Sequence, residues 1–272
     1  MPIDPTAVVA RGAEIDPSAD IGPYCIIGPH VKIGARSQLI AHVVVDNHTE
    51  MGADNVIHPF ARVGGPPQDL KYRGEPARLI IGSHNVIREG ATLNIGTEAG
   101  RMESRIGNHC LLMAYTHVAH DCTIGDHVVM ANSAGLAGHV DLGDHVIVAG
   151  LAGVHQFCKV GHHAFVGAGA MVPQSVPPFC VAQGDRAQLV GINVVGLRRA
   201  GWSKTRLQQV RKAFKRLFQS STTRMMALEH TEETLATESS DVAELCAFIR
   251  HAERGVCPPR TTVAETDPEE EQ

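Results

Sequence analysis

An aliphatic residue recurs at every sixth position through most of the first two thirds of the chain. The pattern runs unbroken through residues 3–63, resumes in the same phase over 81–93, and continues after one extra residue over 106–172. A helix cannot use a six-residue period, and a single strand would repeat every second residue. Period six fits a prism with three flat faces, in which each hexad is one short strand followed by a tight corner.

Three hexads close one coil of eighteen residues, so the aliphatic anchors point inward and stack on their neighbours in adjacent coils. A second small residue follows each anchor by four positions, as in Ala7, Ala13 and Cys122, and fills the remaining interior. Aromatic residues make up only 4% of the chain, which suits a narrow interior. Chance alternation in an ordinary β-sandwich would not hold one phase over so many repeats, so the sequence predicts a mainly β fold of parallel coils.

Two segments interrupt the coils. Residues 64–78 (GGPPQDLKYRGEPAR) leave the pattern and return to it in phase, and a shorter break lies around residues 97–104. Because insertions in a solenoid fall on one face, often the binding face, we expect both segments to border a site.

The six-residue pattern ends after Pro177 and Pro178. Ser203 is a good N-cap, and the apolar residues that follow it recur at helical spacing. A further helical stretch begins after Ser240 and Asp241. We therefore predict a β-helix over residues 1–190, a small helical domain over 191–257, and a disordered acidic tail over 258–272.

The bulk composition excludes several classes of protein. The formal net charge of −5 gives no reason to expect nucleic-acid binding. Seven cysteines without a CxxC pair argue against a disulfide framework. The N-terminal residues lack the features of a signal peptide, and no apolar run is long enough to span a membrane. We expect a cytoplasmic protein without a membrane span.

The six-residue register divides the sixteen histidines by their position in the coil. Most of them fall three residues after an anchor, at an exposed corner, where a solvated turn is the ordinary explanation. Residues eighteen apart occupy one column in adjacent coils, about 4.8 Å apart. Asp121 and His139 therefore share one column, and His120, Gly138 and Gln156 share the next.

This cluster is a candidate for proton transfer. An imidazole titrates near pH 6.5 and can take a proton from a hydroxyl, while a neighbouring carboxylate fixes its tautomer. Corner histidines without a role remain an alternative. So does a metal site in which His117, His120 and His139 act across a subunit interface, as in trimeric carbonic anhydrases, although the spacing differs from that family's. We expect no metal and no cofactor.

The repeat [IVL]-G-x-x-[AVSTC]-x resembles the hexapeptide-repeat transferase superfamily, which implies left-handed coils and a homotrimer with active sites between subunits. Five segments in order, QDLKYRGEP, HVAHDCTIG, LAGHV, VHQF and GINVVGLRRAGWS, resemble the UDP-N-acetylglucosamine O-acyltransferase family. The likeness runs almost end to end and fails only in the final tail.

The resemblance implies an acyltransferase that carries out the first step of lipid A biosynthesis. His120 would be the general base that deprotonates the sugar 3-hydroxyl of UDP-N-acetylglucosamine, which attacks a 3-hydroxyacyl thioester on acyl carrier protein. Asp121 would orient His120, and the Gly138 N–H would stabilise the oxyanion. The residues implied in substrate binding are Gln68, Asp69, Lys71, His117, His139, His155, Gln156, Asn193 and Arg199. Val195 and Ala200 depart from the family pattern, which often has an acidic and a second basic residue there.

A docking surface and a limit on acyl length are also expected. A basic stretch would dock the acidic carrier protein; it comprises Arg198, Lys204, Arg206, Arg211, Lys212, Lys215 and Arg216, with Arg199 beside it. In this family the acyl chain runs parallel to the helix axis. Ala168, roughly 13 Å along the axis from His120, would then limit acyl length at about ten carbons.

Other functions stay open at this point. The chain could be another hexapeptide acyltransferase that acts on a different amino-sugar nucleotide, a metal-dependent hydratase, or a non-catalytic trimeric scaffold. Because one base serves either acceptor, the residues do not distinguish an oxygen from a nitrogen acceptor.

Overall fold

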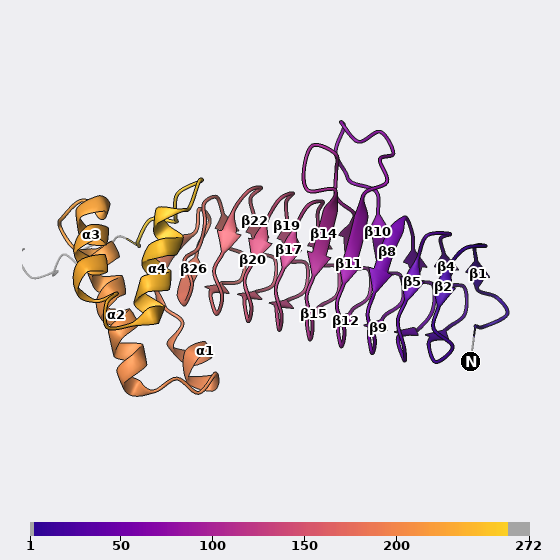
Figure 1. Cartoon of the computed structure of the whole chain (residues 1–272), viewed down its shortest axis with the longest axis horizontal. Helices are drawn as coiled ribbons and strands as arrows, with labels where there is room; N and C mark the ends of the chain where they lie inside the picture. Colours follow the sequence, from indigo (N-terminus) through magenta and orange to yellow (C-terminus); the bar gives the residue numbers. More distant parts are fainter. Residues whose placement is uncertain (1–2, 261–272) are drawn as a thin grey trace, which may run out of the picture.

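The computed structural model describes residues 3–260. Within them the chain forms a left-handed parallel β-helix with a small helical domain at its C-terminal end, as predicted (Figure 1). Three sheets, here named A, B and C, form the faces of the prism. Sheet A contains β3 (Asp20–Ile21), β6 (Gln38–Leu39), β9 (Val56–Ile57), β12 (Val86–Ile87), β15 (Leu111–Leu112), β18 (Val129–Met130), β21 (Ile147–Val148), β24 (Phe165–Val166), β26 (Cys180–Gln183) and β27 (Gln188–Ile192).

The other two faces repeat the same arrangement. Sheet B contains β1 (Val8–Val9), β4 (Ile26–Ile27), β7 (Val44–Val45), β10 (Arg62–Gly65), β13 (Thr92–Asn94), β16 (His117–Val118), β19 (Gly135–Leu136), β22 (Gly153–Val154) and β25 (Met171–Val172). Sheet C contains β2 (Glu14–Ile15), β5 (Lys32–Ile33), β8 (His48–Met51), β11 (Arg78–Ile81), β14 (Glu103–Ile106), β17 (Thr123–Ile124), β20 (Asp141–Leu142) and β23 (Lys159–Val160).

Each two-residue strand turns its first side chain outward and its second inward. The inward residues are the aliphatic anchors, and Ile21, Leu39 and Leu93 are among those with almost no exposed surface. The corners use left-handed backbone at residues that are not glycine, for example His127 (φ 57°) and Asp121 (φ 59°). Asn, Asp and His tolerate this conformation better than most residues, so the corners explain why the chain is rich in histidine.

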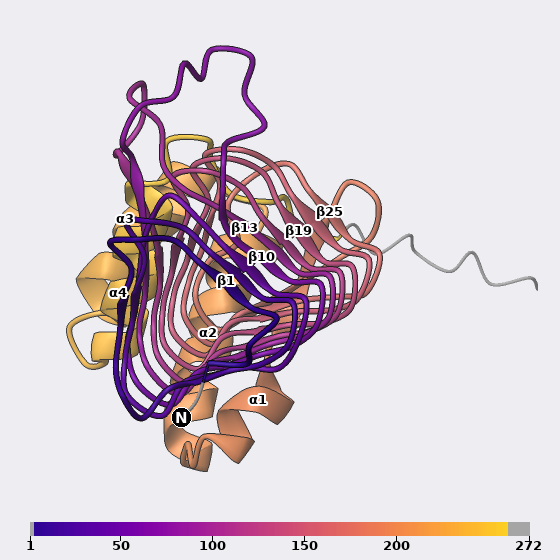
Figure 2. The same ribbon diagram turned by 90° about the vertical axis from the view of Figure 1, so that its right-hand side faces the viewer.

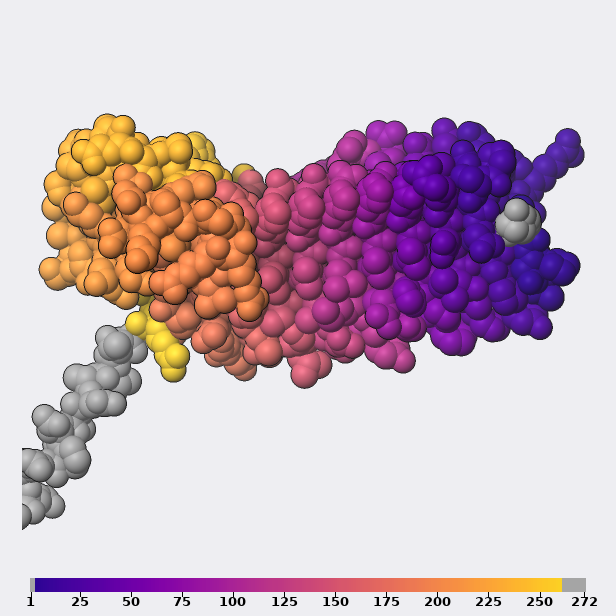
Figure 3. Space-filling view, turned by 90° about the horizontal axis from the view of Figure 1, so that it is seen from below, coloured from indigo at the N-terminus to yellow at the C-terminus, as the bar shows by residue number. Residues whose placement is uncertain are grey.

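Four helices follow the coils in the described residues: α1 (Val194–Arg199), α2 (Lys204–Gln219), α3 (Arg224–Thr234) and α4 (Ser240–Arg250). Ser203 caps α2 by accepting a hydrogen bond from the Arg206 N–H at 3.2 Å. Leu207, Val210, Phe214 and Leu217 then line its buried face. Figure 3 shows the helices packed against the last coils. No described helix has the length and apolarity needed to cross a membrane.

The C-terminal part differs from the prediction in detail. The pattern does not predict α1 or α3, because α1 has only six residues and α3 buries only Ala227, Leu228 and Thr231. Residues 258–260, expected in the disordered tail, instead pair with Leu189, whose N–H donates to the Pro258 carbonyl at 2.8 Å. The rest of the predicted tail, residues 261–272, lies outside the described residues.

Three edges join the faces, and we name them by the sheets they connect. Both interrupting segments leave the prism at the B–C edge, between β10 and β11 and between β13 and β14. Figure 2, viewed along the axis, shows the larger loop rising from one corner while α1 lies on the opposite side. The two insertions therefore fall on one edge, as expected of a solenoid.

Candidate active site

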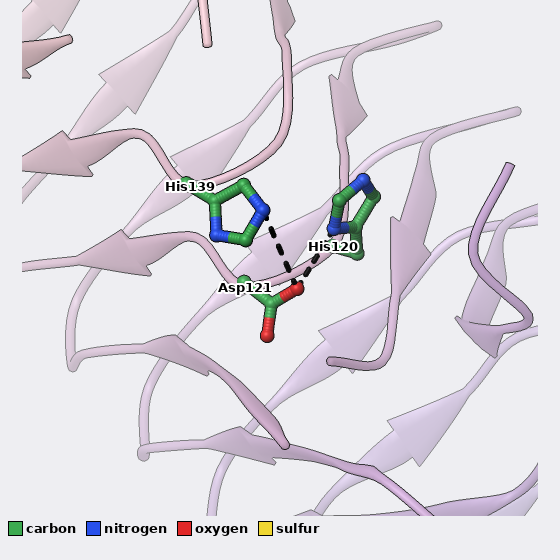
Figure 4. Close-up of side chains that lie close together, drawn as sticks. All are labelled: His120, Asp121 and His139. Atoms are coloured by element: carbon green, nitrogen blue, oxygen red, sulfur yellow. Dashed lines mark hydrogen bonds and ion pairs between the residues drawn. The ribbon is translucent and has the colours of Figure 1, made fainter. Parts of the chain in front are cut away.

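The B–C edge brings together a histidine, a carboxylate and a second histidine. His120 Nδ1 lies 2.8 Å from Asp121 Oδ2, and His139 Nε2 lies 4.0 Å from the same oxygen (Figure 4). His120 and Asp121 occupy the corner that follows β16, and His139 occupies the matching corner one coil further on. The six-residue register thus places the three side chains at one point of the edge.

Asp121 is completely buried, with 0% of its surface exposed. Its carboxylate accepts hydrogen bonds from the Thr97 N–H (3.1 Å), the Thr97 hydroxyl (2.6 Å) and the Arg101 N–H (2.7 Å), all from the shorter loop. Burial disfavours the charge, but the hydrogen bonds from His120, Thr97 and Arg101 outweigh it and lower the pKa of Asp121 to about 2. Asp121 is therefore a fixed anion at neutral pH.

Because the Asp121 carboxylate occupies Nδ1 of His120, the other ring nitrogen, Nε2, is left to contact a substrate. A carboxylate that accepts from Nδ1–H selects the tautomer whose Nε2 is a free base. The imidazole is only partly exposed, so it is held in place while one side stays accessible. This is the arrangement that general-base catalysis requires.

Gly138 lies directly against the His120 ring. A Cβ atom built on Gly138 would come within 2.6 Å of His120 Cε1 and 2.7 Å of Nε2, so a side chain there would displace the imidazole. Within residues 3–260 the Gly138 N–H donates to no other group, although the residue is buried. Gly138 thus combines a backbone donor that makes no hydrogen bond within these residues with a position against the His120 ring.

His139 is positioned by its neighbours in the column. Its ring stacks on Phe157 with centroids 4.4 Å apart and meets His120 edge-on at 5.0 Å. Burial lowers the pKa of His139, and the Asp121 charge opposes that shift. His139 is therefore neutral at physiological pH and can donate or accept a hydrogen bond at the mouth of the site.

The remaining residues at this end of the edge vary in how firmly they are placed. His117 Nδ1 lies 2.7 Å from the Thr92 hydroxyl, and burial lowers its pKa. His155 and Gln156 are exposed one coil beyond His139. On the larger loop, Gln68 and Lys71 are exposed, while Asp69 is half-buried and its charge acts on His139. These expected binding residues lie on β16, on the B–C edge or on the larger loop that leaves it, and the charge of Asp69 reaches His139.

Three residues expected in the site lie elsewhere in the protomer. The Asn193 side chain caps α1 and donates to the His163 carbonyl at 2.9 Å, which places it at the C–A edge. Arg199 ends the same helix. Ala168 lies at the A–B edge, between β24 and β25. A single protomer therefore does not bring these residues to His120.

The basic stretch divides into free and engaged side chains. Arg206 forms a two-pronged ion pair with Asp241 (2.6 and 2.7 Å), and its guanidinium lies 3.6 Å from the centre of the Trp202 ring. Arg216 donates to the Thr234 hydroxyl at 2.6 Å. Both therefore hold the helical domain together, and their expected part in docking stays a prediction. The other expected docking residues are exposed: Arg198, Lys204, Arg211, Lys212 and Lys215.

The alternative of a metal centre can be judged from the same geometry. His120, Asp121 and His139 are the one group of three potential ligands within the described residues whose ligand atoms all lie within 4.8 Å. However, the Asp121 oxygens already accept hydrogen bonds from His120 and the shorter loop. His117, the third ligand of that alternative, is bound to Thr92 and is absent from the group. This donor set fits an oriented base better than a metal.

The sequence did not single out the groups that hold Asp121. Thr97 and Arg101 act through the shorter loop, and Ser104 Oγ accepts from the Asp121 N–H at 2.8 Å. Phe157, which stacks on His139, lies eighteen residues after it, so the column rule could have found it. Nothing in the repeat could have found Thr97, because it lies where the register is broken.

Comparison with known proteins gives consistent matches along the chain. The family model described as UDP N-acetylglucosamine O-acyltransferase, domain 2, matches residues 176–257, and the bacterial transferase hexapeptide model matches residues 103–138. An acyl-[acyl-carrier-protein]–UDP-N-acetylglucosamine O-acyltransferase from Anaeromyxobacter sp. strain Fw109-5 is 48% identical over 94% of this chain and 99% of its own. The enzyme of the same name from Saccharophagus degradans is 43% identical over 93% and 98%.

Solved structures agree with the sequence matches. UDP-N-acetylglucosamine O-acyltransferase from Moraxella catarrhalis is 42% identical, with a TM-score of 0.91 over 93% of this chain and 98% of that one. LpxA from Acinetobacter baumannii is 44% identical, with a TM-score of 0.91 over 94% and 99%. In both cases the likeness covers more than nine tenths of the chain.

Proposed function

Because the chain belongs to the UDP-N-acetylglucosamine O-acyltransferase family, we propose that its B–C edge transfers a 3-hydroxyacyl chain from acyl carrier protein to UDP-N-acetylglucosamine. The acceptor is the glucosamine 3-hydroxyl, and the reaction is the first step of lipid A biosynthesis. The observation that carries the mechanism is the 2.8 Å contact between His120 Nδ1 and the buried Asp121 carboxylate. A cytoplasmic location is part of the same proposal.

The reaction follows from the positions of these groups. His120 Nε2 takes the proton of the sugar 3-hydroxyl as the oxygen attacks the thioester carbonyl carbon. The carbonyl oxygen gains negative charge, which the free Gly138 N–H stabilises as a hydrogen-bond donor. The tetrahedral intermediate then collapses, the C–S bond breaks, and the protonated His120 returns its proton to the departing thiolate.

The surface of the prism supports a homotrimer. The outward side chains of sheet C are largely charged and polar, whereas those of sheet A are mostly apolar. The apolar series comprises Val56, Val86, Leu111, Val129, Ile147, Phe165 and Val181. The A–B edge adds the exposed side chains of Tyr24, Phe60, Tyr115 and Leu151. Apolar surface of this extent is what a partner covers.

A threefold arrangement with the A–B edges at its axis covers this surface. Sheet A of one copy then faces sheet B of the next, and the C–A edge of one copy meets the B–C edge of the next. Asn193 and Arg199, which lie beside the C–A edge, would reach the His120 of a neighbouring copy. There the Arg199 guanidinium suits a nucleotide diphosphate, and Asn193 keeps its helix in place. Sedimentation that shows a monomer would contradict this arrangement.

We propose that the acyl carrier protein docks on the exposed basic residues of α1 and α2. Reversing Arg211 and Lys212 to Glu should raise the KM for the acidic carrier several-fold, with a larger effect at low salt, because salt screens charge steering. Arg206→Glu is a poor probe, since it would also break the ion pair with Asp241. An unchanged KM would remove these two residues from the docking surface.

Product analysis tests the function as a whole. The enzyme is given UDP-N-acetylglucosamine and 3-hydroxyacyl carrier proteins, and mass spectrometry identifies the product and the acylated atom. A 3-O-acyl product supports the proposal, and an N-acyl product or no transfer would refute it. Loss of activity on chelation, restored by zinc, would favour a metal-dependent hydratase instead.

A further inference from the structure

Residues 97–102 of the shorter loop form a tight turn that lies over the Asp121 carboxylate. The N–H groups of Gly100 and Met102 both donate to the Thr97 carbonyl, at 3.1 and 3.0 Å, and close the turn. The Met102 carbonyl accepts from the first N–H of β11 at 3.0 Å, which fixes the base of the turn. A Cβ atom built on Gly100 would overlap the Asp121 carboxylate, so the turn and the carboxylate are in direct contact.

Arg101 extends from this turn onto the outer face of sheet C. Its Nη1 donates to the Thr123 hydroxyl at 2.6 Å and to Asp141 Oδ1 at 2.6 Å, and its Nη2 donates to Asp141 Oδ2 at 3.0 Å. Thr123 and Asp141 face outward at matching positions of β17 and β20, which lie side by side (Figure 1). Thr123 follows Asp121 by two residues, and Asp141 follows His139 by two. One side chain therefore ties the turn to both coils whose corners carry the candidate site.

The two ends of Arg101 hold different groups. Its backbone N–H donates to Asp121 Oδ1 at 2.7 Å, while its guanidinium pairs with Asp141 at the surface. Glu98 and Ala99 in the same turn are exposed, so Arg101 supplies the side-chain contact of this turn with sheet C. An exposed ion pair usually adds little to the stability of a fold, but a two-pronged pair fixes the direction of both side chains. Removing the Arg101 side chain should therefore free the turn without unfolding the coils.

We propose that the pair of Arg101 and Asp141 is a latch that holds the turn over Asp121, an inference that rests on the proposed function. Arg101 is thereby a positioning residue for acyl transfer. With the latch closed, the N–H groups of Thr97 and Arg101 stay on the carboxylate, and the carboxylate keeps its contact with His120. With the latch open, the turn can lift, and the carboxylate loses donors that fix its direction. His120 is then oriented toward the substrate in a smaller fraction of the molecules.

The kinetics of four proteins test the latch: wild type, Arg101→Ala, Asp141→Ala and the double variant. Arg101→Ala keeps the backbone N–H and removes only the side chain. Each single variant should lower kcat about tenfold, because a misplaced catalytic group is costly, while KM for both substrates stays within about twofold. The double variant should be no slower than the slower single variant, since both changes break the same pair. Arg101→Lys, which keeps the charge but not the two-pronged geometry, should recover part of the loss.

The Asp121→Asn background shows whether the loss passes through the carboxylate. In that background Arg101→Ala should lower kcat by less than about twofold, because the charge that the turn positions is already gone. A purely structural defect would instead lower kcat by the same factor in both backgrounds. Arg105→Ala is the matched control: Arg105 pairs with Glu103 of its own strand on the same sheet, and its loss should leave kcat unchanged.

Hydrogen exchange followed by mass spectrometry gives a readout that does not need turnover. Arg101→Ala should speed exchange in residues 97–102, whereas Arg105→Ala should not, and residues 106–172 should keep their protection in both variants. Unchanged protection of residues 97–102 would refute the latch, and faster exchange with wild-type kcat would show that the latch does not position Asp121. If wild type forms no acylated UDP-N-acetylglucosamine, the proposed function fails, and the exchange measurement alone decides whether Arg101 latches the turn.

Discussion

Two edges of the same prism carry columns of histidines, and only one of them sets a histidine against a fully buried carboxylate. At the C–A edge, His84, His109, His127, His145 and His163 form a histidine ladder, with ring centroids 4.6–4.9 Å apart and planes within 5° of parallel. At the B–C edge, His120 and His139 meet edge-on over Asp121. The same repeat and the same residue type thus give two different environments.

The difference lies in what the neighbouring carboxylates do. Asp126 and Asp144 lie next to histidines of the ladder, but their oxygens accept backbone N–H groups, from Asn108 at 2.6 Å and from Asp126 at 2.8 Å. Asp121 is buried, and one of its oxygens reaches the His120 ring. Three donors from the shorter loop hold it there. In the proposed mechanism, a corner histidine can act as a base because an insertion brings these donors to its carboxylate.

The largest expected effect tests this contrast directly. His120→Ala should reduce kcat by about 10²–10⁴, the usual contribution of a general base, with the coils intact by circular dichroism. His127→Gln, in the histidine ladder, is the matched control and should retain wild-type turnover. A His120→Ala variant with near-normal kcat would show that the B–C edge has no privileged base.

Asp121→Asn should come next, with a loss of about 10² in kcat. The amide keeps the size of the carboxylate but has no charge to stabilise the protonated imidazole and no fixed preference for one tautomer. Because the pKa of Asp121 is about 2, the wild-type carboxylate stays charged throughout the assay range, so the loss should not recover at any pH between 5 and 9. Recovery at high pH would contradict a role for the negative charge.

Gly138→Ala tests the position of the His120 ring without removing a functional group. The added Cβ would lie 2.6 Å from His120 Cε1, so the ring must move away from its position. We expect kcat to fall at least tenfold while the thermal midpoint changes little, because the imidazole can swing toward solvent. Unchanged kcat would mean that His120 does not act from the position it has in this structure.

The repeat itself made most of the fold predictable. One inward aliphatic residue per hexad specifies three faces, and eighteen-residue columns place Asp121 below His139 and His120 beside Gly138. The groups that orient Asp121 lie in the break at Thr97, where no periodicity applies. Likewise α3 buries too few apolar residues to produce a helical pattern.

The outer face of sheet B, which is hollowed along Gly135 and Gly153, shows the same limit. Gly135 and Gly153 are ordinary small residues in the sequence, and only their register beside Met171 reveals a trough. The position of Ala168 along the axis can be counted from the sequence. The surface that its side chain meets at its edge of the prism cannot be read from the sequence. The repeat determines how far apart two residues lie along the axis. What surrounds a residue on the outside of the prism depends on the neighbouring side chains and on partners.

The smallest expected effect concerns the histidine ladder, which should matter for stability and not for turnover. Burial lowers the pKa of His163 from its ordinary value to about 4, and His145, His162 and Arg206 add to the shift while Asp144 opposes it. The folded state therefore favours neutral His163. Stability from this group is complete above the unfolded pKa near 6.5 and is lost as pH falls toward 4.

His163 takes up a proton more readily in the unfolded state than in the folded state. His163→Gln removes this difference between the two states. Between pH 7 and pH 4.5 the free energy of unfolding of wild type should fall more than that of the variant, by about 1–3 kcal/mol, since one pKa unit corresponds to about 1.4 kcal/mol. His84→Gln, at the exposed end of the ladder, is the matched control and should behave as wild type. Denaturant titrations at the two pH values measure both. Parallel curves for wild type and His163→Gln would mean that the ladder adds no acid sensitivity, and its histidines would then serve only the left-handed corners that they occupy.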